Sequence, residues 1–172
     1  GSCTPGDVFN GDAVDVWGLE LSGSGDLAPQ FGVTGLQLPV SLTYTYTQSE
    51  FQTSFSSNFF GNVVAGDELN YVPEHQWALT GGVVGDKWGV HTTLSHTSDT
   101  RSEIGSGSIP ANEVIDSRTL VDMAAYYELR EGWRVKLRAE NLFDETYVAA
   151  RRPAGLRPGK PQEIMLGVEL RF

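Results

Sequence analysis

The C-terminal segment of the chain, residues 162–172, alternates between apolar and polar side chains almost without interruption. Successive side chains of a β-strand point to opposite faces, so this alternation predicts a strand with one apolar and one polar face. The apolar face holds Ile164, Leu166, Val168, Leu170 and Phe172, and the polar face holds Glu163, Met165, Gly167, Glu169 and Arg171. Such a strand either packs its apolar face against a second sheet in a soluble protein or turns that face towards lipid.

Six further segments have the same period-two pattern, and helical periodicity is absent almost everywhere. The expected strands cover residues 16–22, 36–47, 76–84, 88–97, 119–129 and 133–140. Twenty glycines and eight prolines in 172 residues also suit one all-β domain with frequent turns. The chain has no run of about 18 apolar residues and therefore no candidate transmembrane helix, but the strands of membrane barrels give a much weaker hydropathy signal.

The connections between the expected strands alternate between short and long. Gly85-Asp86 and residues 130–132 are short turns, whereas the long loops cover residues 48–75, 98–118 and 141–161. Short turns at one end and long loops at the other are typical of outer-membrane barrels, in which the turns are periplasmic and the loops extracellular. Residues 23–35 form a connection of medium length, which we place on the side of the short turns.

Aromatic residues gather near the ends of the expected strands rather than in their middles. The loop end receives Trp17, Tyr44, Tyr46 and Trp77, and the turn end receives Trp88, Tyr127, Trp133 and Phe172. Two such belts fit the two headgroup zones of a membrane barrel. A soluble β-sandwich, the alternative, would place aromatic residues in mid-strand as often as at the ends.

The polar faces of the last three strands carry complementary charges. Arg134, Lys136 and Arg138 form a row, and the neighbouring strands offer Asp122, Glu128, Glu163 and Glu169. Opposite charges on neighbouring strands stabilise a sheet by about 0.2–1 kcal/mol per pair. Such a ladder suits a wet lumen or a solvent-exposed sheet face and would be costly in a sandwich core. His91 is expected to face the lumen, and His96 the lipid or the outer rim.

Other classes of function find little support. The net charge of −10 argues against a nucleic-acid partner. The three histidines lack the spacing of metal ligands, no nucleophile elbow is present, and Gly23-Ser24-Gly25 does not open a helix. We therefore expect no catalytic residue, no metal and no cofactor. Cys3 is either a free thiol or half of a disulfide whose partner lies upstream.

Seven strands are an awkward number for a closed barrel, because bacterial single-chain outer-membrane barrels have even numbers of strands, from about 8 upward. Unpaired backbone groups at the two edges would each cost several kcal/mol in lipid. Either an eighth strand is hidden in residues 3–12, or the chain is one part of a larger barrel.

Motifs near the C-terminus resemble the end of TonB-dependent outer-membrane receptors. The run Asn141-Leu142-Phe143-Asp144 is followed by Tyr147, by Arg157-Pro158-Gly159-Lys160-Pro161 and by a last strand that ends in Phe172. Residues 16–20 and 71–75 resemble further motifs of the family, so the resemblance covers essentially the whole chain. Within the family, the run from Arg151 to Gly155 is most similar to the ferric-citrate receptors.

The resemblance implies an antiparallel transmembrane β-barrel of about 22 strands, of which this all-β chain supplies about seven C-terminal strands. Residues 1–172 would form one partial barrel domain, and the plug domain is absent from this chain. The implied function is import of a ferric chelate, either ferric citrate or a siderophore, across the bacterial outer membrane by a receptor that is not an enzyme. The implied partners are the anionic chelate, outer-membrane lipid and lipopolysaccharide, and the TonB energy-coupling complex, reached through the missing N-terminal part.

The last long loop is the candidate ligand site. Arg151, Arg152 and Arg157 lie there together with Lys160, and guanidinium groups bind the oxygens of an anionic chelate through charge-assisted bonds. Alternatively, these arginines contact lipopolysaccharide phosphates or pair with acidic loops around Asp67, Glu68 and Asp144. The first long loop contains a phenylalanine group that either packs locally or covers ligand, formed by Phe51, Phe55, Phe59 and Phe60.

Two other functions are compatible with the sequence. A small, self-contained outer-membrane barrel would have a structural or adhesion role, and a soluble β-sandwich would be a binding module.

Overall fold

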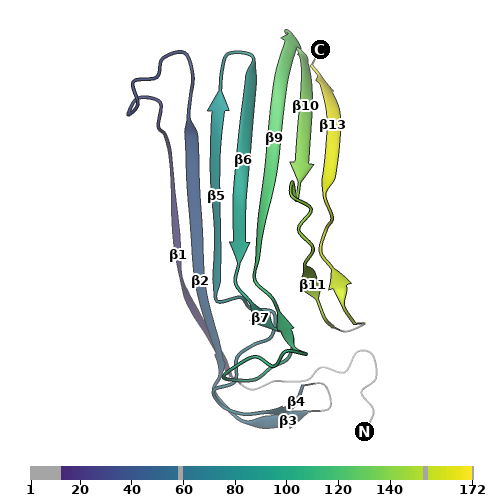
Figure 1. The fold of residues 1–172 in the computed structure, drawn as a ribbon. Coiled ribbons are helices and arrows are strands. Elements are labelled where there is room, and N and C mark those ends of the chain that lie inside the picture. The colour runs from purple at the N-terminus through teal and green to yellow at the C-terminus, as the bar shows by residue number, and fades with distance from the viewer. Residues whose placement is uncertain (1–12, 58–59, 153–154, 172) are drawn as a thin grey trace.

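Seven long strands form one antiparallel sheet (Figure 1). The structure, a computed structural model, describes residues 13–57, 60–152 and 155–171. The order of the strands is the same in sequence and in the sheet: β1 (Val14–Asp26), β2 (Pro39–Phe51), β5 (His75–Val84), β6 (Trp88–Thr97), β9 (Arg118–Arg130), β10 (Trp133–Glu140) and β13 (Glu163–Leu170). Cys3, Phe59, Phe172 and the eighth strand considered within residues 3–12 lie outside the described residues.

The seven expected strands are confirmed, although some of their bounds differ. β6 and β10 have the expected bounds, whereas β2 begins later than expected, at Pro39, and continues to Phe51. Asp26 accounts for the late start, because its carboxylate accepts a hydrogen bond from the backbone N–H of Leu38 at 2.7 Å and so holds the preceding residues in a turn. The extension follows from pairing with β1, where Val14 lies opposite Phe51.

The register gathers apolar side chains of all seven strands on one face of the sheet. Cross-strand partners share a face, and one apolar row crosses four strands through Val90, Ala125, Leu137 and Leu166. Leu166 is 75% exposed in this row. An uncovered apolar surface of this width is unfavourable in water, whereas it is the surface that a barrel wall presents to lipid.

Within the described residues the sheet forms a single layer, with no core beneath it. The other three sheets are two-stranded hairpins in the long connections rather than a second layer. The buried apolar side chains of the described residues are few, and they belong to Ala28, Phe51, Val63, Ile115 and Ala139. A soluble β-sandwich needs two packed sheets, so that alternative is wrong. None of the described residues belongs to a helix that is long and apolar enough to cross a membrane.

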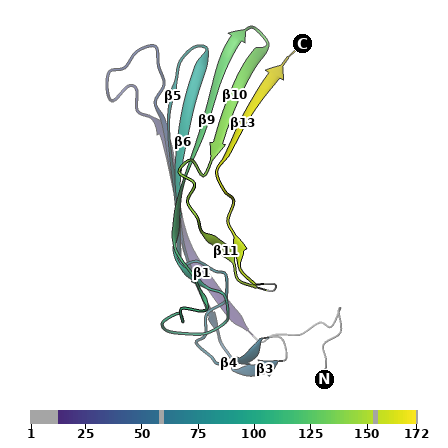
Figure 2. The ribbon, with the colours of Figure 1, turned by 45° about the vertical axis from the view of Figure 1, so that its right-hand side comes forward.

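The sheet is curved along its length and across its width, like a section of a barrel wall (Figure 2). The connections 27–38, 85–87 and 131–132 lie at one end, which we call the turn end, and the three long loops lie at the opposite end, the loop end (Figure 1). The medium connection therefore lies on the side of the short turns, as expected. Among the described strands, β1 and β13 are the edges of the open sheet.

Aromatic side chains mark both ends of the apolar face. At the turn end, Trp88 lies opposite Tyr127. At the loop end, the rings of Trp17 and Tyr46 meet edge to face, with their centroids 5.5 Å apart. The two expected belts are therefore present on the strands that the structure describes.

His91 and His96 of β6 face opposite sides of the sheet, as the alternation predicts. The ring of His96 stacks on Trp77 in the apolar face at 5.5 Å, and its Nδ1 lies 2.8 Å from Oγ1 of Thr119. His91 lies on the polar face, directly across from Gly82.

The polar face carries the expected ladder of charges. Arg134 lies 3.7 Å from Glu128 of β9, and Lys136 forms an ion pair with Glu169 of β13. Arg138 differs from the expectation, because it pairs with Glu140 of its own strand at 2.7 Å. Two of the expected acidic partners instead bind residues of the last long loop. The Asp122 carboxylate accepts a hydrogen bond from the backbone N–H of Asn141, and Glu163 forms an ion pair with Lys160.

Candidate ligand site

Each of the three long loops contains a short hairpin that the sequence pattern did not predict. The first loop carries β3 (Phe55–Ser57) and β4 (Gly61–Val63), the second β7 (Thr100–Arg101) and β8 (Val114–Ile115), and the third β11 (Val148–Ala150) and β12 (Arg157–Pro158). Strands of two or three residues are too short to show alternation, which is the signal on which the sequence prediction depended. The hairpins give the loops a defined shape at the loop end of the seven-stranded sheet, which we call the wall (Figure 1).

Arg101 links the second loop to the first through an ion pair and a backbone hydrogen bond. Its side chain is only 4% exposed, its Nε donates to Glu68 Oε2 at 2.9 Å, and its Nη2 donates to the carbonyl oxygen of Gly107 at 3.0 Å. The backbone carbonyl of Arg101 also accepts a hydrogen bond from the backbone N–H of Tyr71 at 2.9 Å. A buried guanidinium needs such partners, because an unpaired buried charge costs several kcal/mol.

The three arginines of the sequence prediction lie together in the third loop, and two of them contact other loops. Arg151 Nε donates to the carbonyl oxygen of Val114 in the second loop at 2.6 Å. The backbone N–H of Arg152 donates to the hydroxyl of Tyr71 in the first loop at 2.9 Å. Arg157 is exposed, and its Nη2 donates to the carbonyl oxygen of Arg152 at 2.7 Å.

The acidic partner of Arg152 is Glu103 in the second loop. This differs from the pairing considered above, since Glu68 binds Arg101 and the Asp67 carboxylate accepts a hydrogen bond from the Val64 backbone at 2.8 Å. The sequence signal for Glu103 was weak, because a single glutamate in a polar loop has no distinguishing spacing. Arg101 and Tyr71 were missed for the same reason.

A hollow of about 400 Å³ lies among the three loops beside Arg152. We call it the loop hollow, and its lining comprises Phe60, Asn70, Tyr71, Ser102, Glu103, Ile104 and Arg152. Tyr71 has a left-handed backbone conformation with φ of 60°, which is uncommon outside glycine. Backbone strain of this kind, about 1–3 kcal/mol, persists only where the surroundings hold the residue in place. The contacts to Arg101 and Arg152 do so here.

Of the phenylalanine group in the first loop, two members pack locally. Phe51 is buried, and its ring contacts Phe55 edge to face, with centroids 5.5 Å apart. Phe60 lines the loop hollow. The described members of the group therefore contribute both to local packing and to the candidate site.

Asn141 organises the base of the third loop. It is buried with φ of 48°, and its amide nitrogen donates to the carbonyl oxygens of Glu145 and Lys160, both at 2.9 Å. Its Oδ1 accepts the backbone N–H of Glu145 at 2.8 Å, and its own N–H donates to Asp122 on β9 at 2.8 Å. The asparagine of the Asn-Leu-Phe-Asp motif therefore has a structural role here.

Lys160, the fourth basic residue of this loop, is occupied by acidic partners from the wall. Its ammonium group contacts Glu140 and lies 2.6 Å from Glu163 Oε2. Hydrogen bonds to these two carboxylates raise the pKa of Lys160 above its usual value. Lys160 therefore anchors the loop to the wall.

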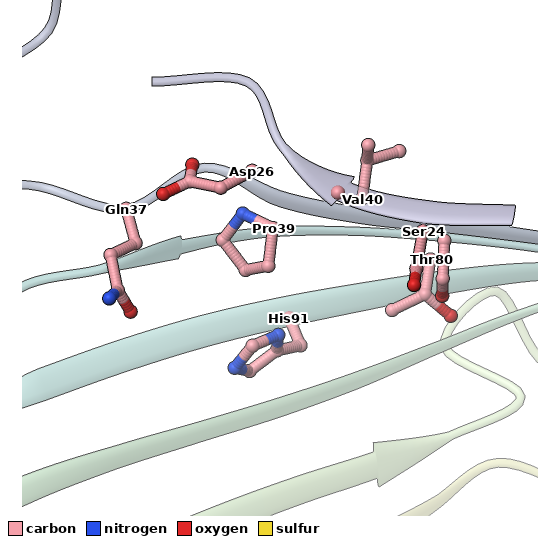
Figure 3. A pocket seen from close by; sticks show the side chains of 9 residues that line it. Ser24, Asp26, Gln37, Pro39, Val40, Thr80 and His91 are labelled. Atoms are coloured by element: carbon pink, nitrogen blue, oxygen red, sulfur yellow. The ribbon is translucent and has the colours of Figure 1, made fainter. Parts of the chain in front are cut away.

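A second hollow, of about 430 Å³, lies on the polar face near the turn end (Figure 3). His91, Thr80 and Ser24 come to it from three strands, Asp26 lies at the end of β1, and Gln37 comes from the β1–β2 connection. This hollow lies near the opposite end of the strands from Arg151, Arg152 and Arg157. The described residues contain no group of three or more His, Cys, Asp or Glu side chains that could hold a metal ion.

The chain is similar to one protein family and to several solved structures. The family described as TonB dependent receptor-like, beta-barrel matches residues 2–142. The siderophore receptor PiuA from Acinetobacter baumannii is 17% identical with a TM-score of 0.68, and the match covers 91% of this chain and 22% of PiuA. The open form of the ferric-catecholate import receptor Fiu from Escherichia coli K12 is 20% identical with a TM-score of 0.53, covering 92% of this chain and 26% of Fiu.

The closed form of Fiu is 14% identical with a TM-score of 0.57, and the match covers 92% of this chain and 32% of Fiu. The chain therefore spans about a quarter of these receptors, and the similarity shows a common fold. No curated protein is similar enough in sequence to match the chain.

Proposed function

Because the chain belongs to the TonB-dependent receptor-like β-barrel family, we propose that it supplies wall strands and outer loops to a receptor that imports an anionic ferric chelate. Members of this family are outer-membrane proteins of Gram-negative bacteria, which places the wall in the outer membrane. They act as receptors and transporters, and we propose no catalytic role for this chain.

The cluster of arginines in the third loop, two of which contact the other loops, is the observation that supports this proposal. Arg151, Arg152 and Arg157 bring positive charge to the loop end of an otherwise acidic chain. Anionic chelates present carboxylate or phenolate oxygens, which guanidinium groups bind well. PiuA is a siderophore receptor and Fiu a ferric-catecholate import receptor. These names favour a siderophore, and the resemblance of residues 151–155 to the ferric-citrate receptors favours citrate.

We further propose that residues 1–172 form one partial barrel domain within a longer receptor. The remaining wall, the plug domain and the segment that meets the TonB energy-coupling complex would lie elsewhere in that receptor. Outer-membrane lipid would cover the apolar face, and lipopolysaccharide would surround the loop end. An isolated, self-contained barrel is less favoured because the described strands leave the edges of β1 and β13 open.

Uptake of radioactive iron by cells that express the full-length receptor tests the proposal. We expect uptake of a ferric chelate that stops when the inner membrane is de-energised and that falls when Arg151→Ala and Arg152→Ala are combined. Lys87→Ala, which removes an exposed basic side chain at the turn end, is the matched control. Equal uptake with and without the receptor would refute the transport function. Unchanged chelate affinity in the double variant would refute the assignment of the arginines.

A further inference from the structure

The loop hollow differs in chemistry from the exposed arginines around it. Its walls are partly apolar, formed by the rings of Phe60 and Tyr71 and the side chain of Ile104, and Arg152 is the single cationic side chain among the described residues that line it. A carboxylate-rich ligand placed there would lose hydration against apolar walls without gaining enough partners. A flat aromatic ring would instead bury apolar surface and pack against Tyr71 and Phe60.

The size of the loop hollow limits what it can hold. Its volume of about 400 Å³ lies near the lower end of the about 300–1,000 Å³ that is usual for small-molecule pockets. It therefore suits one ring of a ligand rather than a complete chelate with several arms around a metal ion.

Arg152 supplies the charge that such a ring requires. Its guanidinium borders the loop hollow, and in the structure it is paired with the carboxylate of Glu103, which also belongs to the lining. The side chains of this pair are 59% and 40% exposed, respectively. Exposed ion pairs are weak, so an incoming anionic oxygen can displace Glu103 at little cost. Glu103 thus occupies the position that a ligand oxygen would take.

We propose that the loop hollow binds one oxygen-bearing aromatic ring of an anionic ferric chelate, with Arg152 on the ring oxygen and Tyr71 and Ile104 on the ring faces. Glu103 competes internally for Arg152 when the ligand is absent. The inference rests on the proposed import of a ferric chelate and narrows its substrate class to aryl chelates. The strained backbone of Tyr71, held by Arg101 and Arg152, fixes one wall of the hollow before any ligand arrives.

Equilibrium binding of two iron probes to the full-length purified receptor tests the inference. The probes are iron complexed with 2,3-dihydroxybenzoate, which carries aromatic rings, and ferric citrate, which does not. We expect Ile104→Ala to weaken binding of the aryl complex about tenfold or more, because an apolar contact is removed. Arg152→Gln should weaken it about 10- to 100-fold, and Glu103→Gln should strengthen it up to about fivefold by removing the competitor.

Ile109→Ala is the matched control, because it makes the same substitution in the same loop at a residue that does not line the hollow. Folding is checked by the heat-dependent gel shift of each variant. The inference is overturned if the receptor binds ferric citrate but not the aryl complex, or if Ile104→Ala and Ile109→Ala bind the aryl complex equally well; either result leaves chelate import intact. A receptor that binds neither probe and takes up no iron contradicts both the inference and the proposed function.

Discussion

The wall and the loop end of this chain differ in how their side chains are packed. In the wall, alternating side chains cover a single layer, and its apolar residues remain exposed on one face, as Leu166 does. At the loop end, side chains such as Val63, Arg101 and Ile115 are buried among hairpins. The loops therefore have the packing of a small globular unit, whereas the wall depends on lipid and on neighbouring strands. In the proposed function, a ligand that arrives at the loop end meets groups already held in place.

The largest expected effect is the loss of stability when a charge is placed on the apolar face of the wall. Leu79→Arg places a charge on the middle of β5 towards lipid and should lower the free energy of unfolding of the full-length receptor in vesicles by about 2–4 kcal/mol. Ala78→Arg, one residue away, points to the polar face beside Thr43 and Ser95 and should be tolerated. Urea unfolding compares the two variants, and equal losses would mean that the assignment of the faces is wrong.

The next effect concerns the base of the third loop. Asn141→Ala removes three side-chain hydrogen bonds from a buried residue and should destabilise the loop by about 1–3 kcal/mol. Hydrogen exchange of residues 141–162 measures this change, which should leave β1 and β2 unaffected. Asn112→Ala, at an exposed position of the second loop, is the control. Identical protection in both variants would contradict the structural role of Asn141.

Separating the first two loops should have a smaller effect. Arg101→Gln removes the contact with Glu68, whose side chain is 51% exposed and regains water. We expect a loss of about 1–2 kcal/mol in local stability, seen as faster hydrogen exchange in both loops. If only the second loop responds, Arg101 does not join the two loops.

The smallest expected effect is a dependence on pH at Lys160. Its pKa is raised in the folded state by Glu140 and Glu163, so the folded chain holds this proton more tightly than the unfolded chain does. The resulting stability is fully present below the unfolded pKa of about 10.4 and is lost as the pH rises through the higher folded value. The melting temperature of the wild type should exceed that of Lys160→Gln at pH 8 and approach it above the folded pKa. A difference in melting temperature that stays constant across this pH range would show that the Lys160 proton does not contribute to stability.

The sequence predicted the wall far better than the loops, for a physical reason. Period-two alternation reports which face of a strand meets lipid, and it identified β6, β10 and the opposite orientations of His91 and His96. The start of β2 was misplaced because Leu36 and Leu38 continue the alternation, whereas Asp26 ends the pairing through a hydrogen bond to the backbone of Leu38.

The loop end depends on contacts between residues distant in sequence, which no local pattern encodes. The arginines of residues 151–157 were found from their charge alone. Their contacts with Val114, Tyr71 and Glu103 join positions more than thirty residues apart. The loop hollow arises from these contacts and could not be anticipated.

Hydrogen–deuterium exchange of the full-length receptor, with and without a bound ferric chelate, shows whether the three long loops bind the chelate. We expect protection to appear in residues 60–75, 98–117 and 141–152 at the loop end and not in the turns 85–87 and 131–132. Protection confined to the turn end, or no change in the three loops at saturating chelate, would contradict this expectation.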